Sequence, residues 1–383
     1  MTAVRIEPRA ALPNATADAV HMARALELAA RGLYTTDPNP RVGCVLVRGG
    51  EVIGEGWHER AGEPHAEILA LRAAGGEVRG ATAYVTLEPC SHTGRTPPCA
   101  DALIDAGIGR VVCAVSDPNP KVAGDGIKRL EAAGIDVAVG TLAAASRALN
   151  PGFFSRFERR RPFIRLKLAM TLDARTTPAG GGRAWITGEA ARADVQTFRA
   201  RSSAVLTGAG TVRIDDPRLD VRLAYGTWVR QPLRVVLDPD LRCAAAARVY
   251  DGDHSVVFAA AGANGPRVVP EPLPEPELLD GRISVARVPR APGGLDLPSV
   301  VERLTALEVN ELLVECGPRL AAGFLAADLV DELVLYVAPC FLGADAAPLA
   351  ALRGATQTLR RFEFLDQQLI GEDLRLILTP KRD

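Results

Sequence analysis

Four residues near the start of the chain are of the types that bind and use a metal ion. His65 and Glu67 are separated by one residue, and Cys90 and Cys99 follow further along. One imidazole and two thiolates are a suitable ligand set for Zn²⁺, and three protein ligands leave the fourth tetrahedral position for water. This open arrangement is typical of catalytic zinc. The residue types therefore predict a catalytic rather than a structural zinc site.

Glu67 is the candidate acid–base catalyst, because it is close enough to His65 to reach past the metal without binding it. Zinc lowers the pKa of water so that hydroxide is available at neutral pH. The carboxylate would take the water proton and pass protons to a ring nitrogen and a leaving amine. His-x-Glu followed by Pro-Cys is typical of zinc-dependent nucleobase deaminases, which separate the two cysteines by two residues. Here eight residues separate Cys90 from Cys99, which leaves the substrate class open.

Taken singly, each of these residues has an ordinary structural interpretation. His65 could be a satisfied core or surface histidine, and free cysteines are among the most buried residue types. The combination, in this order, favours the site. Two other interpretations stay open: a deaminase that edits nucleic acid, and a binding protein whose zinc is structural. A structural site normally has a fourth protein ligand, for which His92 is the nearby candidate.

Predicted strands and helices alternate through the first part of the chain and place the site at element ends. Helical periodicity begins after Thr16, His65 opens a second helix, and Cys99 opens a third. Predicted strands lie between these helices. The alternation predicts a layered α/β domain over residues 16–150.

A second α/β domain is predicted over residues 160–383. Asn150-Pro151-Gly152 and the basic run at residues 156–161 mark the change between the two domains. In the second domain, a predicted strand at residues 311–315 leads into Gly317-Pro318 and a helix. The free N–H groups of such a helix start can bind a phosphate. An ordinary βα turn has the same pattern.

Composition and charge exclude some partners. The chain has 383 residues, with 45 basic and 46 acidic side chains and a net charge of −1. This balance gives no support for a nucleic-acid or acidic-membrane partner. We expect a flexible tail at residues 1–15, with neither a signal peptide nor a transmembrane run. Seven cysteines without a framework spacing are typical of reduced thiols, and thus of a cytoplasmic protein.

The residues around the predicted zinc site also resemble a known family, the bifunctional deaminase/reductase of riboflavin biosynthesis. The long loop between the cysteines is a mark of its deaminase half. The similar segments are residues 39–44, 56–58, 64–67, 86–99 and 117–120.

This resemblance implies a cytidine-deaminase-like fold of three layers with one Zn²⁺. The implied activity is hydrolytic removal of the 2-amino group of 2,5-diamino-6-ribosylamino-4(3H)-pyrimidinone 5′-phosphate. Asn39 resembles the pyrimidine-binding asparagine of the family. From their position beside the metal, Ser91, His92 and Arg95 are candidates for contacts to the sugar or phosphate.

The second domain resembles the reductase half of the same family, through segments from Leu166 to Leu333. This implies a dihydrofolate-reductase-like fold that binds NADPH without a Rossmann fingerprint, hydride transfer to C1′ of the ribosylamino group, and a homo-oligomer. The implied NADPH-binding residues are Ala169, Trp185, Thr211, Asp215, Gly317, Pro318, Arg319, Leu320, Ala321, Ala322 and Gly323. The implied substrate-binding residues are Arg183, Arg199, Leu219, Arg222 and Glu315.

Two positions depart from the reductase pattern of that family. Ala174 stands where the family usually has glycine in Leu-Asp-Gly-Arg. Arg183 stands where the family usually has a substrate-binding serine, two residues before Trp185. Arg183 could pair with a phosphate or weaken the site.

Overall fold

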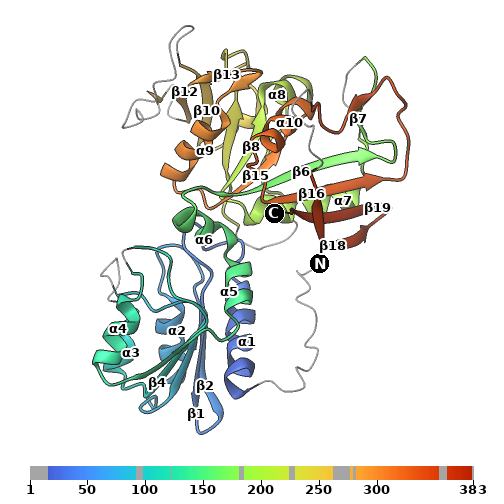
Figure 1. Ribbon diagram of the computed structural model, residues 1–383. Coiled ribbons are helices and arrows are strands. Elements are labelled where there is room, and N and C mark those ends of the chain that lie inside the picture. Colours follow the sequence, from blue (N-terminus) through green and yellow to red (C-terminus); the bar gives the residue numbers. More distant parts are fainter. Residues whose placement is uncertain are drawn as a thin grey trace. The chain divides into compact units, whose positions relative to one another are not determined.

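The chain forms two compact units, Met1–Asn150 and Pro151–Asp383. The structure is a computed structural model (Figure 1). It describes residues 16–91, 98–120, 122–180, 185–223, 229–261, 277–278, 282–352 and 360–381. The predicted tail at residues 1–15 and the candidates His92, Arg95 and Arg183 lie outside the described residues.

The first unit is a mixed sheet between two layers of helices. Its strand order is β2-β1-β3-β4-β5, in which β1 runs antiparallel to β2 and β3, while β3, β4 and β5 are parallel. The strands are β1 (Gly43–Arg48), β2 (Glu51–Trp57), β3 (Thr82–Val85), β4 (Arg110–Cys113) and β5 (Asp136–Val139). The helices are α1 (Ala17–Ala30), α2 (Ala66–Ala74), α3 (Cys99–Asp105), α4 (Asp125–Ala132) and α5 (Ala143–Leu149).

Alternating side chains of the strands fill two separate cores, one on each face of this sheet. Cys44 and Leu46 of β1 pack with α2, α3 and α4 on one face. Val45 and Val47 pack with α1 on the other face. Because successive side chains of a strand point to opposite faces, one run of apolar residues serves both layers. The predicted three-layer arrangement is therefore confirmed (Figure 1).

The second unit is built on a ten-stranded sheet with the order β11-β12-β10-β9-β8-β15-β6-β16-β19-β18. These strands are β6 (Phe163–Thr171), β8 (Ala204–Gly208), β9 (Leu233–Leu237), β10 (Ser255–Ala260), β11 (Glu277–Leu278), β12 (Ile283–Val288), β15 (Glu311–Glu315), β16 (Glu332–Ala338), β18 (Phe362–Ile370) and β19 (Asp373–Pro380). Short pairs are formed by β7 (Arg175–Thr177) with β17 (Ala347–Pro348) and by β13 (Arg290–Ala291) with β14 (Gly294–Leu295). The helices are α6 (Pro151–Glu158), α7 (Glu189–Arg201), α8 (Ala209–Asp215), α9 (Leu297–Ala306) and α10 (Pro318–Ala326), with a 3₁₀ turn at Arg248–Tyr250.

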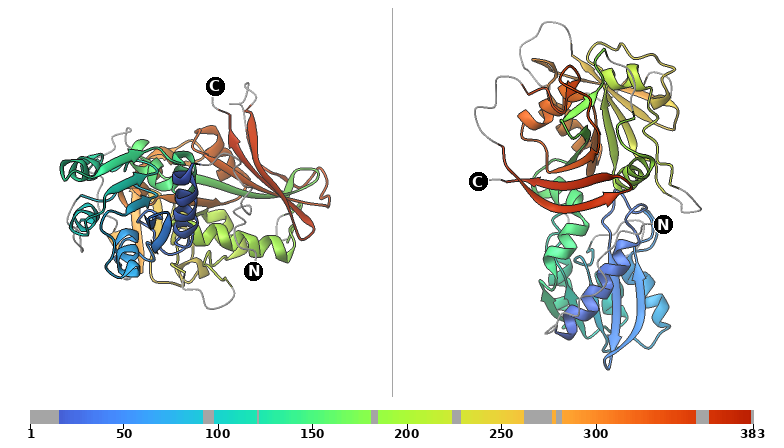
Figure 2. Two further views of the ribbon diagram at one scale, coloured as in Figure 1. Left: turned by 90° about the horizontal axis from the view of Figure 1, so that it is seen from below. Right: turned by 90° about the vertical axis from the view of Figure 1, so that its right-hand side faces the viewer.

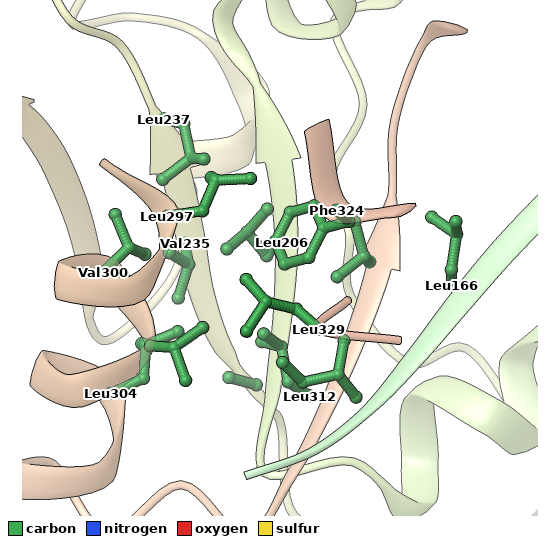
Figure 3. Packing of buried hydrophobic residues seen from close by; sticks show 14 of the residues in the cluster. Leu166, Leu206, Val235, Leu237, Leu297, Val300, Leu304, Leu312, Phe324 and Leu329 are labelled. Carbon is green, nitrogen blue, oxygen red and sulfur yellow. The ribbon is translucent and has the colours of Figure 1, made fainter. Parts of the chain in front are cut away.

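The central strands of this sheet are parallel and buried on both faces, which explains their almost continuous apolar sequences. Figure 3 shows one face, where Leu206 and Leu312 of the strands pack against Leu304 of α9 and Phe324 of α10. The other face packs against α7 through Val195 and its neighbours. The β18–β19 hairpin forms one edge of the sheet (Figure 2). Among the described residues, no helix is long and apolar enough to cross a membrane.

Candidate functional site

Two helix N-termini and one strand end bring the three predicted metal ligands together. His65 is the N-cap of α2, Cys99 is the first residue of α3, and Cys90 follows β3. The Nδ1 atom of His65 lies 3.2 Å from Sγ of Cys99 and 3.6 Å from Sγ of Cys90. Tetrahedral zinc with ordinary bond lengths holds such atoms roughly 3.5–3.8 Å apart. The donor set and its spacing therefore fit one zinc ion.

The two cysteine thiols have opposite pKa shifts because they are hydrogen-bonded to each other. A hydrogen bond from the Cys99 thiol lowers the pKa of Cys90 to about 4, despite its burial. The Cys90 sulfur in turn raises the pKa of Cys99 far above its ordinary value, and burial adds to this effect. A zinc ion displaces such a proton, because the metal binds thiolates. Among the described residues, this is the one cluster of three such side chains that could hold a metal.

Glu67 lies in the first turn of α2, beside the metal ligands, and is 3% exposed. Burial raises the pKa of its carboxyl group. Its Oε2 atom has no hydrogen-bond partner among the described residues. A buried carboxyl group with one unpaired oxygen and a raised pKa is suited to accept and return a proton.

The predicted pyrimidine-binding residue Asn39 contacts His58, at the end of the β2 hairpin. Its Nδ2 atom lies 3.1 Å from Nε2 of His58, and Nδ1 of His58 lies 3.2 Å from the carbonyl oxygen of Pro64. The rings of His58 and His65 meet edge to face, with centroids 5.3 Å apart. The sequence analysis gave no role to His58. Its position directly after the predicted strand that ends at Trp57 was the sequence feature that could have indicated a role for His58.

Glu88 is a second residue whose role the sequence analysis did not predict. It is 3% exposed and lies two residues before Cys90. Its carboxylate accepts backbone N–H bonds from four residues around the start of α4, at 3.0–3.3 Å: Asp117, Gly124, Gly126 and Ile127. The N-cap of α4 is a glycine without a side chain, so Glu88 supplies the missing cap. These bonds hold Asp117 and Gly124 beside the segment that carries Cys90.

In the second unit, four predicted substrate-binding residues form one connected group. Arg199 of α7 donates to both carboxylate oxygens of Glu315, at 2.6 and 2.9 Å, and to the carbonyl oxygen of Asp220. Burial alone raises the pKa of Glu315, but Arg199 outweighs it, and the net pKa is lowered. Arg222 is exposed and pairs with the Asp220 carboxylate at 3.2 Å. Leu219, directly before Asp220 in the chain, is buried and has a φ of 54°, a strained conformation for leucine.

Lys167 of β6 joins this group, although the sequence analysis did not select it. It is the register partner of Glu315, the last residue of β15. Burial lowers the pKa of its ammonium group, while Glu315 opposes that shift. A lysine inside an otherwise apolar parallel strand was the signal that could have found it, because lysine is seldom buried without a function or a partner.

The predicted NADPH-binding residues are mostly at the carboxyl ends of β6, β8 and β15, which are neighbours in the sheet. Ala169 is near the end of β6, Thr211 and Asp215 are in α8 after β8, and Gly317 is the N-cap of α10. Open α/β sheets bind ligands at this edge. Trp185 is 63% exposed, with the guanidinium of Arg192 over its ring at 4.6 Å. The remaining predicted residues, Pro318–Gly323, form the first turns of α10.

Comparisons with known proteins give the same division. Residues 15–115 match the cytidine and deoxycytidylate deaminase zinc-binding region, and residues 162–376 match the RibD C-terminal domain. The riboflavin biosynthesis protein RibD of Escherichia coli is 46% identical over 374 residues, which are 94% of this chain and 99% of that protein. The RibD of Haemophilus influenzae is 44% identical, over 95% of this chain and 98% of that protein.

Solved structures agree over nearly the whole length. A RibD structure from Acinetobacter baumannii has a TM-score of 0.86 at 40% identity, and covers 96% of this chain and 99% of that one. A diaminohydroxyphosphoribosylaminopyrimidine deaminase/5-amino-6-(5-phosphoribosylamino)uracil reductase from Thermotoga maritima has a TM-score of 0.81 at 32% identity, with coverage of 95% and 99%. The predicted resemblance and both predicted folds are thus confirmed. The chain belongs to the RibD family of bifunctional riboflavin biosynthesis enzymes, with a zinc-site deaminase unit followed by a reductase unit.

Proposed function

We propose that this chain catalyses two consecutive reactions on one pyrimidine. The first is hydrolytic deamination of 2,5-diamino-6-ribosylamino-4(3H)-pyrimidinone 5′-phosphate. The second is NADPH-dependent reduction of the ribosylamino side chain to ribitylamino. The observation that carries the proposal is the convergence of His65, Cys90 and Cys99 beside the buried, half-unpaired carboxyl group of Glu67. The activities named for the Thermotoga maritima relative support the choice of substrate.

In the deaminase site, His65, Cys90 and Cys99 hold the zinc ion, and Glu67 moves the protons. When bound, zinc supplies a nucleophilic water at neutral pH by lowering the pKa of that water. Glu67 accepts one proton of the water and delivers it to the ring nitrogen; it then takes the second proton from the hydroxyl now on the ring carbon and delivers it to the departing amino group, which leaves as ammonia. Water thus adds an oxygen to the ring carbon as the carbon–nitrogen bond breaks. Asn39 holds the pyrimidine ring during both transfers.

In the reductase site, the strand ends and the N-terminus of α10 bind the dinucleotide. Ala169, Trp185, Thr211, Asp215 and Gly317–Gly323 contact NADPH, which supplies the hydride for C1′ when bound. Arg199, Leu219, Arg222 and Glu315 hold the substrate, and the exposed Arg222 meets its phosphate. Arg183 is a further candidate for that phosphate. Lys167, close to Glu315, holds a sugar hydroxyl or carries the proton that balances the hydride.

We propose further that the enzyme is a homo-oligomer in the cytoplasm and acts on small molecules. The edge strand β18 supports self-association, because Phe364, Leu365 and Leu369 are 67%, 59% and 71% exposed on a strand with a free edge. All seven cysteines are free thiols, which is usual for a reducing compartment. Sedimentation of the purified protein tests the oligomer, and a monomer at micromolar concentration would contradict it.

One experiment tests both activities. The purified zinc-loaded protein is incubated with the diamino-pyrimidinone substrate, with and without NADPH, and product masses are followed. We expect exchange of the amino group for oxygen without NADPH, and a further gain of two hydrogens with it. Deamination without any reduction would retain the first reaction and remove the second. A substrate mass that stays unchanged would contradict the whole proposal.

A further inference from the structure

His58 is buried between the pyrimidine-binding residue and the chain segment that carries the first metal ligand. Its two ring nitrogens have different partners: Nδ1 is 3.2 Å from the Pro64 carbonyl oxygen, and Nε2 is 3.1 Å from the Asn39 side chain. Both partners are uncharged, and only 3% of the residue is exposed. The amide nitrogen of Asn39 faces Nε2, so Nε2 accepts a hydrogen bond and the ring carries a single proton.

The hydrogen bond to Pro64 decides how the Asn39 carboxamide is oriented. A carbonyl oxygen only accepts hydrogen bonds, so the single ring proton of His58 is on Nδ1. The Nε2 atom then has a lone pair, and Asn39 must direct an N–H group at it. The carboxamide oxygen of Asn39 is therefore turned away from His58.

We propose that His58 is a positioning residue that sets the orientation of the Asn39 carboxamide for a pyrimidinone ring. One N–H of Asn39 is used by His58, which leaves the oxygen and the second N–H along one edge of the amide. That edge matches a lactam, in which a ring N–H donor stands beside a carbonyl acceptor. A cytosine-type edge has the donor and acceptor exchanged, and would need the carboxamide reversed against the His58 lone pair. The inference rests on the proposed deaminase function.

Two substitutions separate this role from a purely structural one. An asparagine at position 58 places its amide N–H about where Nδ1 lies, so His58→Asn keeps the bond to Pro64 and loses the acceptor for Asn39. A glutamine reaches about as far as Nε2, so His58→Gln keeps an acceptor for Asn39 and loses the bond to Pro64. Each variant thus retains one of the two contacts that the ring makes.

The experiment measures deamination by both variants and by the double variant with Asn39→Ala. We expect His58→Asn to raise KM for the pyrimidinone about tenfold, because a buried polar partner is left unpaired. Its kcat should change less than KM. His58→Gln should stay within about threefold of the native kcat/KM. In the Asn39→Ala background, His58→Asn should have almost no further effect, because the two residues act as one unit. The zinc content per chain should be unchanged throughout.

Three results would overturn the proposal. In the first, His58→Asn has native deaminase activity and His58→Gln is impaired, which would mean that only the hydrogen bond to Pro64 matters. In the second, the effects of His58→Asn and Asn39→Ala on deamination are additive, which would mean that the two residues act independently. The third measurement is independent of activity and of variant folding: ¹⁵N-histidine spectra of the zinc-loaded native protein should show the Nδ1–H tautomer for His58. An Nε2–H tautomer would require the Asn39 carboxamide oxygen to face His58, and would contradict the proposal. A native protein without deaminase activity would instead contradict the proposed function, whatever the tautomer.

Discussion

The two units collect their functional side chains in different ways. In the deaminase unit, the site consists of the ends of three short elements, with His65 and Cys99 at helix starts and Cys90 after a strand. In the reductase unit, the candidate substrate group is an internal ion pair, Arg199 with Glu315, between a helix and a central strand. The first kind of site depends on residue type. The second depends on which strands become neighbours.

The two kinds of site should also differ in how a substitution affects stability. Removing a metal or a proton carrier from the first unit should stop a reaction while the fold persists. Removing one partner of a buried ion pair in the second unit should lower both activity and stability, because the other charge is left unpaired. The four predictions below test this contrast, from the largest expected effect to the smallest.

Removal of zinc should have the largest effect. After treatment with a chelator, deamination should fall below detection, because no metal-bound water is then available as the nucleophile. Reduction of the already deaminated substrate should keep its rate, and added zinc should restore deamination. Metal analysis and both assays on one sample provide the measurement. Full deamination by protein shown to be metal-free would refute the zinc site.

Substitution of the proton carrier should have the next largest effect. Glu67→Gln keeps the shape of the side chain but removes its acid–base function, so kcat for deamination should fall by roughly 10²–10⁴-fold. The zinc content and the reductase rate should stay native. Glu63→Gln is the matched control, since Glu63 is exposed on the preceding segment. A Glu67→Gln enzyme with native kcat would require a different residue to move the protons.

The contrast explains what could be predicted from the sequence. The cluster of His65, Cys90 and Cys99 was predictable from residue type, order and spacing, and so was the place of Glu67 beside it, because few other arrangements give that chemistry. His58 and Glu88 were not, because each acts through a fold-dependent contact, with Asn39 and with the start of α4. Lys167 gave a usable signal that the sequence analysis did not use.

The same reasoning applies to the elements of the fold. Helical periodicity correctly located α1 after Thr16, and the predicted strand at residues 311–315 is β15, because burial gives these patterns. Asn150-Pro151-Gly152 was predicted to interrupt the regular structure, whereas Pro151 is the first residue of α6. Proline suits that position, since its missing N–H has no partner there in any case. Strand β18 was missed because it is exposed on both faces and so has no alternating pattern.

Breaking the ion pair of the second unit should have a moderate effect on two properties. Arg199→Ala removes both side-chain hydrogen bonds that the Glu315 carboxylate accepts from Arg199, so the free energy of unfolding of this unit should fall by about 3 kcal/mol and the reductase activity should fall too. The double variant Arg199→Met, Glu315→Leu should recover most of the stability and none of the activity. Urea unfolding and NADPH oxidation provide the two readouts. Restored reduction in the double variant would show that neither residue binds substrate.

The smallest effect concerns a strained residue outside the substrate group. Ala174 has a φ of 56°, where an L-residue is strained and glycine is not. This explains why the position is usually glycine in the resemblance noted above. The loop still holds its shape because the Asp173 carboxylate accepts N–H bonds from Leu342 and Gly343. Ala174 is exposed, so its methyl group contributes little packing.

Ala174→Gly should therefore raise the free energy of unfolding of the reductase unit by about 0.5–1 kcal/mol and leave NADPH oxidation unchanged. Ala193→Gly is the matched control, because Ala193 is exposed in the middle of α7, where glycine should lower stability by about 1 kcal/mol. Opposite signs for the two variants in urea unfolding would establish the strain at position 174. The equally strained Leu219 is buried within the substrate group, so there the strain and the site cannot be separated by one substitution. A destabilised Ala174→Gly would show instead that chain entropy outweighs the strain, and that this family position is free to vary.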